Sequence, residues 1–559
     1  MENTKSSYEF HCQLEGFFVF CRREWKAIAL CGGVFLLAML AAIAFVDPAF
    51  FYPRLSSDPL NYYLKAKSLA ETGSTSATTA INLPPFAYAA MPGVLRTPFV
   101  MLFQDFDDQL RAMQLFNMLI LGSVALMSAY IFSWVHPRGR HRYVIAFAFA
   151  FTLLSPIWLA NVFLPLADAP YAAFSLAALL VLIPIICAEH PLRMKAPIAL
   201  FAVLFGVAFM LRFTAPVLLV FAAVLAHGRW RLNTMSRRLW IAVGSATAAF
   251  LLVLVAFNTQ AIFDRYFFVP VWFVSKGDKL GMVVNLLAVA LPSQVVPNFQ
   301  LGFVHPPIES HLATKFTESP LDVAWTIVGL LICAVILPGL WKSRDRFLPE
   351  IAYVLVPLPV LVPILPSTTR YVMSYQAFVW IFFSVGAIAF AKWSGLARLL
   401  RKRAFVVTAA VLLVSGVVGL RWWKMAGTAS ERVLAVTVTS APGYINAVGG
   451  TFRGLRRFLE TLPPDRTLLV GDYATTGRWK IIAGLDYYSP DKSLPSVVRN
   501  REVYLLAECG TLDTCQSWDH FKEKSQKRVL EFGHFEFESV YAAQSPRAHV
   551  EVFRIRNSL

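Results

Sequence analysis

The chain has 559 residues, of which 57% are hydrophobic and only 15% are charged. A mean hydropathy of +0.56 lies well above that of ordinary soluble proteins, so the composition excludes a soluble globular chain and predicts a polytopic membrane protein. The net charge of +17 follows from basic loops and from possible contact with anionic lipid, so nucleic-acid binding is not predicted.

Apolar segments long enough to cross a bilayer recur along the chain. A spanning helix needs roughly 20 apolar residues. The sequence therefore predicts a mainly α protein, a polytopic helical bundle, in which two short segments around Arg212 form a tight or broken hairpin. About eleven candidate spans result, at 26–46, 115–135, 144–164, 170–187, 197–211, 215–226, 240–257, 321–341, 350–366, 372–391 and 405–421.

Basic residues in the short connections indicate the orientation. Lys and Arg gather in alternate connections, and cationic loops are retained in the cytoplasm. The short connections on the other side, 165–169 and 367–371, contain one basic residue between them, Arg370. We therefore predict a cytoplasmic N-terminus and a C-terminus outside.

Three regions are expected. They are a cytoplasmic arm (1–25), a transmembrane domain (26–424) with long outside loops at 47–114 and 258–320, and an outside domain (425–559). The arm carries acidic residues and no small-residue cleavage site, so the first span acts as an uncleaved signal-anchor. We expect a multi-pass protein of the plasma (inner) membrane. The lack of Asn-x-Ser/Thr in the outside segments favours a bacterial source.

The sequence changes character in the outside domain. Short β-rich runs at 467–471, 502–506 and 549–553 follow an amphipathic helical stretch near 450–462. This pattern predicts a small α/β domain with extracytoplasmic location.

Two of the seven cysteines, Cys509 and Cys515, lie close together in the outside domain. Their glycine-containing spacer allows a disulfide, which would fit an oxidising compartment. A zinc pair is the competing interpretation, but no second Cys or His pair stands at metal-site spacing. The other five lie in the cytoplasmic arm or within helices, where packing explains them: Cys12, Cys21, Cys31, Cys187 and Cys333.

An aspartate, Asp58, stands just beyond the first predicted span, in the long loop 47–114. The aromatic residues Tyr62 and Tyr63 follow it. The loop keeps many aliphatic and aromatic residues, which predicts helices on the membrane surface rather than a solvated linker. A carboxylate placed here can act as a general base. Because Pro59 comes next, Asp58 can also cap a helix, and the two roles are compatible.

A second acid, Asp168, lies in a turn between two predicted spans on the same outside face, where it can assist a base or merely cap a helix. Arg212 at the hairpin apex and Arg370 at the start of a span suit a phosphate, because a guanidinium makes bidentate bonds and keeps its proton. Tyr371 follows Arg370, and the helix dipole there also favours an anion. Snorkelling to lipid phosphate is the alternative for each arginine.

Two lysines, Lys276 and Lys279, lie in the second long loop. They are either solvated or face a bound substrate.

These features, taken in order, resemble the GT-C glycosyltransferases, with the aminoarabinose and galacturonic-acid transferases and the protein O-mannosyltransferases as the nearest groups. The resemblance covers most of 25–425 through several short motifs. It rests on the N-in first span, Asp58 with Tyr62 and Tyr63, Ala66 leading to Gly73, Asp168, Leu211-Arg212, Arg370-Tyr371 and the outside α/β tail.

The resemblance implies that a sugar on a polyprenyl phosphate is transferred, with inversion, to a hydroxyl or amine outside the membrane. The partners would be that donor, a lipid, glycan or protein acceptor, and membrane lipid, in lipopolysaccharide or other cell-envelope glycan biosynthesis. Preorganised charge on the leaving phosphate would be a large catalytic contribution. Asp58 (the base) and Asp168 would be catalytic, Arg212, Arg370 and Tyr371 would bind the donor phosphate, and Tyr62, Tyr63, Lys276 and Lys279 would line the substrate site.

The sequence also departs from parts of this group. Protein O-mannosyltransferases carry an acidic pair at the first motif, whereas Pro59 follows Asp58 here, which disfavours that branch. Oligosaccharyltransferase-type relatives use a divalent metal, to which His305, Glu309 and His311 could contribute, although ordinary loop residues look the same. We predict no metal among the site residues and no required cofactor, with a divalent metal as the open alternative.

Two other functions fit the composition. A lipid or glycan transporter or flippase would place ionisable residues near the bilayer midplane, often in related halves, whereas the candidate acids and arginines here gather at one face. An O-antigen ligase or polymerase would also act outside on lipid-linked sugars but would not need Asp58. We therefore predict a polyprenyl-phosphate-sugar-dependent glycosyltransferase.

Overall fold

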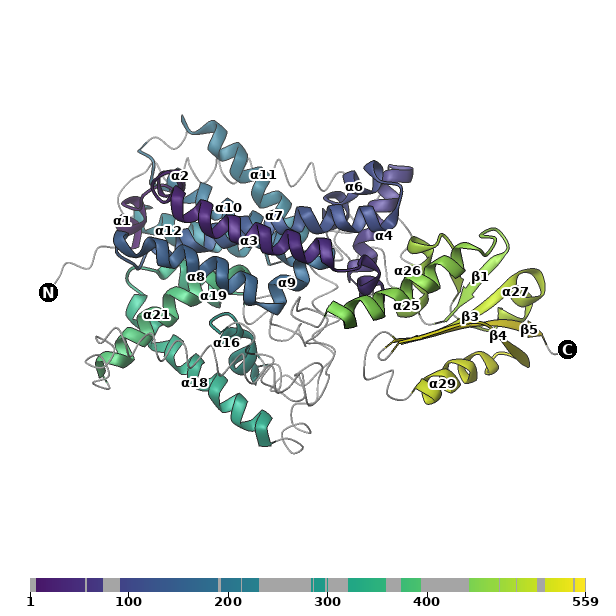
Figure 1. Cartoon of the computed structure of the whole chain (residues 1–559). Coiled ribbons are helices and arrows are strands. Elements are labelled where there is room, and N and C mark those ends of the chain that lie inside the picture. Colours follow the sequence, from purple (N-terminus) through teal and green to yellow (C-terminus); the bar gives the residue numbers. More distant parts are fainter. Residues whose placement is uncertain are drawn as a thin grey trace. The chain divides into compact units, whose positions relative to one another are not determined.

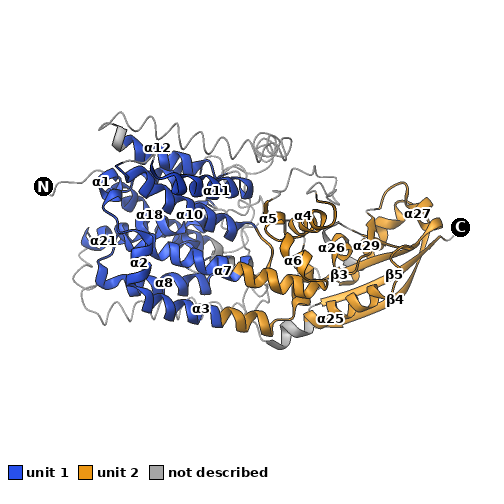
Figure 2. Cartoon of the chain, turned by 90° about the horizontal axis from the view of Figure 1, so that it is seen from above, with its two compact units in different colours: residues 1–37, 118–161, 167–423 blue, residues 38–117, 162–166, 424–559 orange. Residues whose placement is uncertain are grey.

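The computed structural model describes residues 7–55, 58–73, 91–189, 193–212, 214–230, 283–284, 286–296, 299, 320–357, 373–393, 442–471, 473–488, 490–509, 518–545 and 548–557 (Figure 1). They form many helices and one small sheet near the C-terminus, which confirms the predicted mainly α architecture with an α/β tail. The chain divides into two compact units (Figure 2). Unit 1 contains Met1–Leu37, Met118–Asn161 and Ala167–Trp423, and unit 2 contains Ala38–Asn117, Val162–Leu166 and Lys424–Leu559.

Among the described residues, five helical segments are long and apolar enough to cross a membrane. They coincide with the predicted spans that begin at residues 26, 115, 170, 321 and 372. The predicted spans 240–257 and 405–421 lie outside the described residues. The five segments are α3 (Trp25–Phe45), α7 (Phe106–Ser133), α10 (Asp168–Cys187), most of α18 (Pro320–Ser343), and η9 (Met373–Tyr375) with α21 (Gln376–Trp393).

The predicted span 144–164 consists of two helices, α8 (His141–Leu154) and α9 (Pro156–Phe163). Proline lacks a backbone N–H and fits the first position of a helix, so Pro156 starts a new helix instead of continuing the first. The hairpin predicted around Arg212 is broken as expected. Its two arms are α11 (Lys195–Leu211) and α12 (Val217–Trp230).

In unit 1, α18 and α21 pack very closely against each other. A Cβ atom at Gly339 would lie 1.8 Å from the Phe382 carbonyl oxygen, and one at Gly386 would lie 1.9 Å from the Val335 oxygen. The two backbones therefore touch, as small residues allow between membrane helices. The remaining elements of this unit are α1 (Ser7–Cys12), α2 (Phe17–Arg23), η3 (Arg138–Arg140), η6 (Leu286–Ala290), α16 (Leu291–Ser293) and α19 (Leu348–Leu355).

The N-terminal arm is fastened to the helices of unit 1. His11 on α1 lies 2.5 Å from the Glu350 carboxylate on α19, and both side chains are buried. Cys12 forms a disulfide with Cys187 at the end of α10. The expectation that packing alone accounts for these two cysteines is therefore wrong. Their separation of 175 residues offered no spacing signal.

The attachment of the arm is expected to depend on pH through His11. Burial lowers the His11 pKa, but the Glu350 carboxylate more than offsets this and the pKa is raised, with Arg346 opposing. The His11–Glu350 pair therefore stabilises the folded protein fully at pH values below about 6.5, the His11 pKa in the unfolded chain. This stabilisation is lost as the pH rises through the raised His11 pKa of the folded protein. We expect the difference in melting temperature between wild type and His11→Asn to shrink between about pH 6 and pH 9. A difference in melting temperature that stays constant over this pH range would contradict the prediction.

Unit 2 joins the loop 47–114 to the C-terminal segment of the chain. Its sheet has five strands in the order β2-β1-β3-β5-β4, in which β1 is parallel to β2 and β3, and β5 is antiparallel to β3 and β4. The predicted β-rich runs are β1, β3 and β5, whereas β2 and β4 were not predicted. The strands are β1 (Thr467–Val470), β2 (Asp486–Tyr488), β3 (Glu502–Cys509), β4 (Phe535–Ser545) and β5 (Ala548–Asn557).

Helices cover both faces of this sheet (Figure 1). Leu468, Val503 and Phe553 face one side and pack with residues of α27 and α29. The other side lies against α25 and α26. The described helices of unit 2 are the last turns of α3, η1 (Pro48–Arg54), α4 (Asp58–Thr72), α5 (Met91–Val94), α6 (Thr97–Leu102), the first turns of α7, α25 (Pro442–Glu460), α26 (Tyr473–Ile482), α27 (Leu494–Asn500) and α29 (Trp518–Leu530).

Candidate functional site

Asp58 is the first residue of α4, and Pro59 is the second. The Asp58 side chain lies outside the described part of the structure, so its roles as base and as cap stay predictions. Tyr62 and Tyr63, one turn further on, are buried at 4% exposure each. The Tyr63 hydroxyl donates to the Gln109 side chain near the start of α7, so it fixes α4 inside unit 2. The predicted substrate-lining role of both tyrosines remains a prediction.

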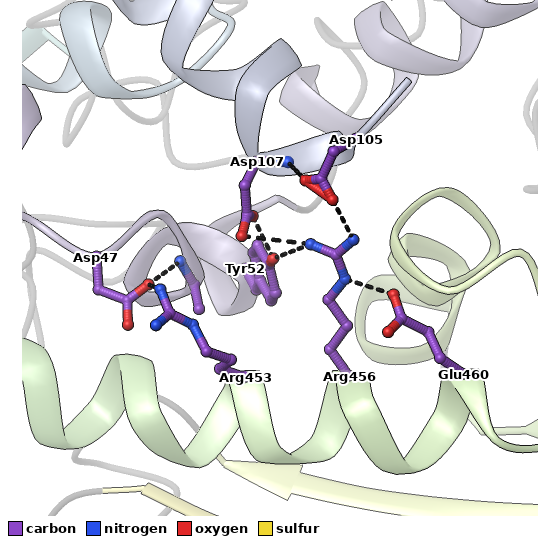
Figure 3. A network of polar contacts seen from close by, with 8 residues as sticks. Asp47, Tyr52, Asp105, Asp107, Arg453, Arg456 and Glu460 are labelled. Carbon is purple, nitrogen blue, oxygen red and sulfur yellow. Dashed lines mark hydrogen bonds and ion pairs between the residues drawn. The ribbon is translucent and has the colours of Figure 1, made fainter. Parts of the chain in front are cut away.

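The segment before α4 is held by a group of charged side chains from α25 (Figure 3). Asp47 accepts from the Ala49 N–H (2.9 Å) at the start of η1 and pairs with Arg453 (2.7 Å). Arg456 donates to the Tyr52 hydroxyl at 3.0 Å. It also pairs with Asp105 (2.8 Å), Asp107 (3.3 Å) and Glu460 (2.7 Å).

The electrostatics of this group follow from burial and pairing. The pKa of Tyr52 is raised because the side chain is buried and because it donates to the Asp107 carboxylate. Burial raises the pKa of Asp107 as well. Burial also works against ionisation of Asp105, but the hydrogen bond from Arg456 outweighs it and lowers the Asp105 pKa. The Tyr52 phenol therefore keeps its proton and works as a hydrogen-bond donor.

A buried ion pair links the sheet to the same segment. Arg478 on α26 contacts Glu508 on β3, and both residues are only 3% exposed. Arg478 also donates to the carbonyl oxygens of Pro53 (2.5 Å) and Tyr52 (3.2 Å) in η1. The Arg478 guanidinium thus pairs with a buried carboxylate and also donates to two backbone carbonyl oxygens of η1.

Arg96, which the sequence analysis missed, is another buried cation of unit 2. It is 1% exposed and donates to the carbonyl oxygens of Pro92 and Leu166, the latter at 2.6 Å. Burial lowers its pKa to about 10. None of the described residues supplies a carboxylate partner for it. A single arginine in an apolar loop gives no sequence signal of this burial.

The turn after α9 is held by amide side chains as well as by Arg96. In unit 2, Gln114 donates to the Phe163 oxygen, and Asn117 donates to the oxygens of Val162 and Leu164, each at 3.3 Å. In unit 1, Asn161 accepts from the Ala169 N–H at 3.1 Å. Turns usually leave their carbonyls to water, so this turn is unusually well fixed.

Asp168 and Arg212, both predicted site residues, form a buried ion pair in unit 1. Their exposures are 3% and 7%, and the guanidinium contacts carboxylate atom Oδ1. Asp168 is the first residue of α10, and Arg212 directly follows α11. Among the described residues, the other carboxylate atom of Asp168, Oδ2, has no hydrogen-bond partner. The structure therefore describes Asp168 as a partner of Arg212 and not as a helix cap.

A hydroxyl pair lies next to this ion pair in the chain, since Thr214 is two residues from Arg212 and Tyr171 is three residues from Asp168. The Thr214 hydroxyl donates to Tyr171 at 2.9 Å. Tyr353 and Tyr375 are buried and pack edge to face, with ring centroids 5.2 Å apart. The interior of unit 1 thus contains tyrosine hydroxyls as well as the ion pair.

Some predicted site residues cannot be placed. Those outside the described residues are Arg370, Tyr371, Lys276, Lys279 and Cys515, and they remain predictions. Cys509 at the end of β3 is disulfide-bonded, but its pairing with Cys515 stays a prediction for that reason.

The predicted absence of a metal is likewise untested. In the described ranges, no group of three or more His, Cys, Asp and Glu side chains is arranged to hold a metal ion. His305, Glu309 and His311, the alternative ligands, lie in a segment that the structure does not describe.

The chain resembles several solved structures, although no protein-family model and no curated protein matches it. ArnT from Cupriavidus metallidurans bound to undecaprenyl phosphate is 14% identical with a TM-score of 0.46, over 93% of this chain and 97% of that one. The Archaeoglobus fulgidus oligosaccharyltransferase in the apo form is 12% identical with a TM-score of 0.47, over 89% and 73%. Both are glycosyltransferases of the GT-C group that the sequence resembles. At this level of similarity, neither substrate nor site residues carry over.

Proposed function

We propose that the chain is an integral-membrane glycosyltransferase that moves a sugar from a polyprenyl-phosphate donor to an acceptor outside the membrane. The observation that carries the proposal is the buried Asp168–Arg212 pair. Ionisable groups inside a membrane helix bundle are costly and mark functional sites. A guanidinium suits a phosphate, since it stays charged and presents several donors in one plane.

In the proposed reaction, an acceptor hydroxyl or amine attacks the anomeric carbon of the donor sugar. The bond between that carbon and the phosphate oxygen breaks, and the configuration inverts. Asp58 takes the proton of the acceptor, and polyprenyl phosphate leaves as an anion that Arg212 and Arg370, with Tyr371, stabilise. Asp168 orients the Arg212 guanidinium, a positioning role that the direct contact of the two side chains supports.

A transfer assay on the purified protein in nanodiscs tests the proposal. Undecaprenyl phosphates that carry radiolabelled aminoarabinose, galacturonic acid or mannose are offered with lipid A, a lipid-linked glycan or a peptide as acceptor. We expect one combination to yield a labelled product with inverted anomeric configuration together with free undecaprenyl phosphate. Heat-denatured protein is the control.

The same donors in proteoliposomes separate this function from transport. A flippase would move the labelled donor across the bilayer with its sugar–phosphate bond intact. Translocation of intact donor without any labelled product would overturn the proposal.

A further inference from the structure

The short helix η1 precedes α4 in the chain and contacts α25 and α26 of the C-terminal α/β fold. Tyr52 in η1 is fully buried, and it is held on three sides. Its hydroxyl donates to Asp107 and accepts from Arg456, and its ring lies edge to face with Trp479, at 6.0 Å between centroids. Its carbonyl oxygen accepts from Arg478. Tyr52 is therefore the point at which α7 and α25 meet η1 (Figure 3), and its ring and carbonyl oxygen also contact α26.

The contacts that fix η1 continue along the chain toward Asp58. The Leu55 N–H donates to the Tyr52 oxygen at 3.1 Å, so the residue that directly follows η1 is bonded to the same carbonyl that Arg478 contacts. Leu55 is 3% exposed, and α4 begins three residues later at Asp58. A shift of η1 would move the first turn of α4 with it, because so few residues connect the two.

The rest of α4 is fixed independently. Tyr63 is bonded to Gln109, whose amide donates to the Phe103 oxygen at 2.7 Å. A Cβ atom at Gly93 would lie 2.8 Å from the Lys65 Cβ atom, so α5 presses directly on α4. These contacts fix the middle of α4, and η1 is the element that directly precedes its first turn in the chain.

Stability alone does not explain this arrangement. Burying the Arg478–Glu508 pair costs desolvation, and apolar residues of similar size often serve stability as well or better. The charged groups add defined geometry, because each guanidinium donates hydrogen bonds to particular oxygen atoms and so fixes their positions. A catalytic group needs such precision, because a displacement of about 1 Å can lower a rate by about 100-fold.

We propose that Tyr52, Arg456 and Arg478 are positioning residues that hold the first turn of α4, and with it Asp58, in place for the transfer reaction. The inference rests on the proposed function for its catalytic consequence. In this proposal, the C-terminal α/β fold holds in place the segment that carries the base Asp58.

Hydrogen exchange tests the mechanical part of the inference without reference to activity. Tyr52→Phe removes one hydroxyl and keeps the ring, and Arg478→Met removes the buried cation. We expect amides at the start of α4 to exchange at least about 10-fold faster in both variants, as for a segment released from its tertiary contacts. Arg556→Met, which removes an exposed partner of Glu538 on the same sheet, should leave them unchanged. Unchanged exchange in Tyr52→Phe would overturn the inference.

Kinetics test the catalytic part. We expect Tyr52→Phe to lower kcat by about 10-fold to 100-fold while KM for the undecaprenyl-phosphate sugar stays within about twofold, because a misplaced base affects the transition state more than binding. A melting temperature that falls with kcat unchanged would show a purely structural network and overturn the proposal. If wild type transfers no sugar, the proposed function is wrong, while the exchange result still decides whether this network holds α4.

Discussion

Replacing Asp58 with asparagine is expected to lower kcat for sugar transfer by about 10²-fold to 10⁴-fold, the usual contribution of a general base. Asparagine cannot accept the acceptor's proton, so the hydroxyl or amine would have to attack the donor sugar while still protonated. Asparagine caps a helix about as well as aspartate does, so the start of α4 should keep its stability. Transfer of radiolabelled sugar and the melting temperature, both measured in nanodiscs, check the two parts of this prediction.

The same pair of measurements decides between the base and the cap. Asp108→Asn is the matched control, because Asp108 is an exposed acid in the same unit, in the first turn of α7, and it should keep full activity. Asp58→Ala should lose both activity and, through the cap, about 1 kcal/mol of stability. Undiminished transfer by Asp58→Asn would remove Asp58 from the mechanism and leave it only a structural role.

The sequence predicted the ionisable residues of unit 1 but not their pairing. Hydropathy and loop charge placed Asp168 and Arg212 at the same face of the membrane, because both stand at ends of apolar segments. They are 44 residues apart, and no pattern within a segment reveals a contact between two helices. The structure adds that this acid is a partner of the arginine.

Unit 2 was harder to predict from the sequence. The loop 47–114 was expected to form helices on the membrane surface, and its contact with the C-terminal segment, through Asp47 and Tyr52 to α25, was not predicted. Sequence separations of about 400 residues leave no local signal. Arg456 and Arg453 look like an ordinary solvated face of a helix until their partners are known.

The strands illustrate the limits of periodicity. β1, β3 and β5 are the inner strands of the sheet, and their buried apolar residues give a sequence signal even where polar residues alternate with them, as in β5. β4 lies at the edge of the sheet and is mostly exposed, so charged residues interrupt its pattern, and β2 is only three residues long. Edge strands lack the hydrophobic signal that burial imposes.

Replacing Arg212 with methionine is expected to cost about 3–5 kcal/mol of folding free energy, because it leaves the Asp168 carboxylate buried without its partner. Transfer should also fall, by about 10²-fold or more, since the guanidinium would no longer meet the developing phosphate charge. Thermal unfolding in nanodiscs measures the first effect, and the rate at saturating donor, scaled to the folded fraction, measures the second. The exposed Arg344, 3.7 Å from Asp345, provides the control, and Arg344→Met should cost no more than about 1 kcal/mol.

The double variant Asp168→Leu/Arg212→Met separates the two effects. Apolar residues of similar size can replace a buried ion pair at little cost, so the double variant should recover most of the lost stability. Its transfer rate should stay as low as that of Arg212→Met, because the charge that stabilises the leaving phosphate is still missing. Recovery of both stability and transfer would mean that the pair only holds α10 to α11 and that another cation meets the phosphate. Recovery of stability alone assigns the arginine to the reaction, since packing has then been restored without it.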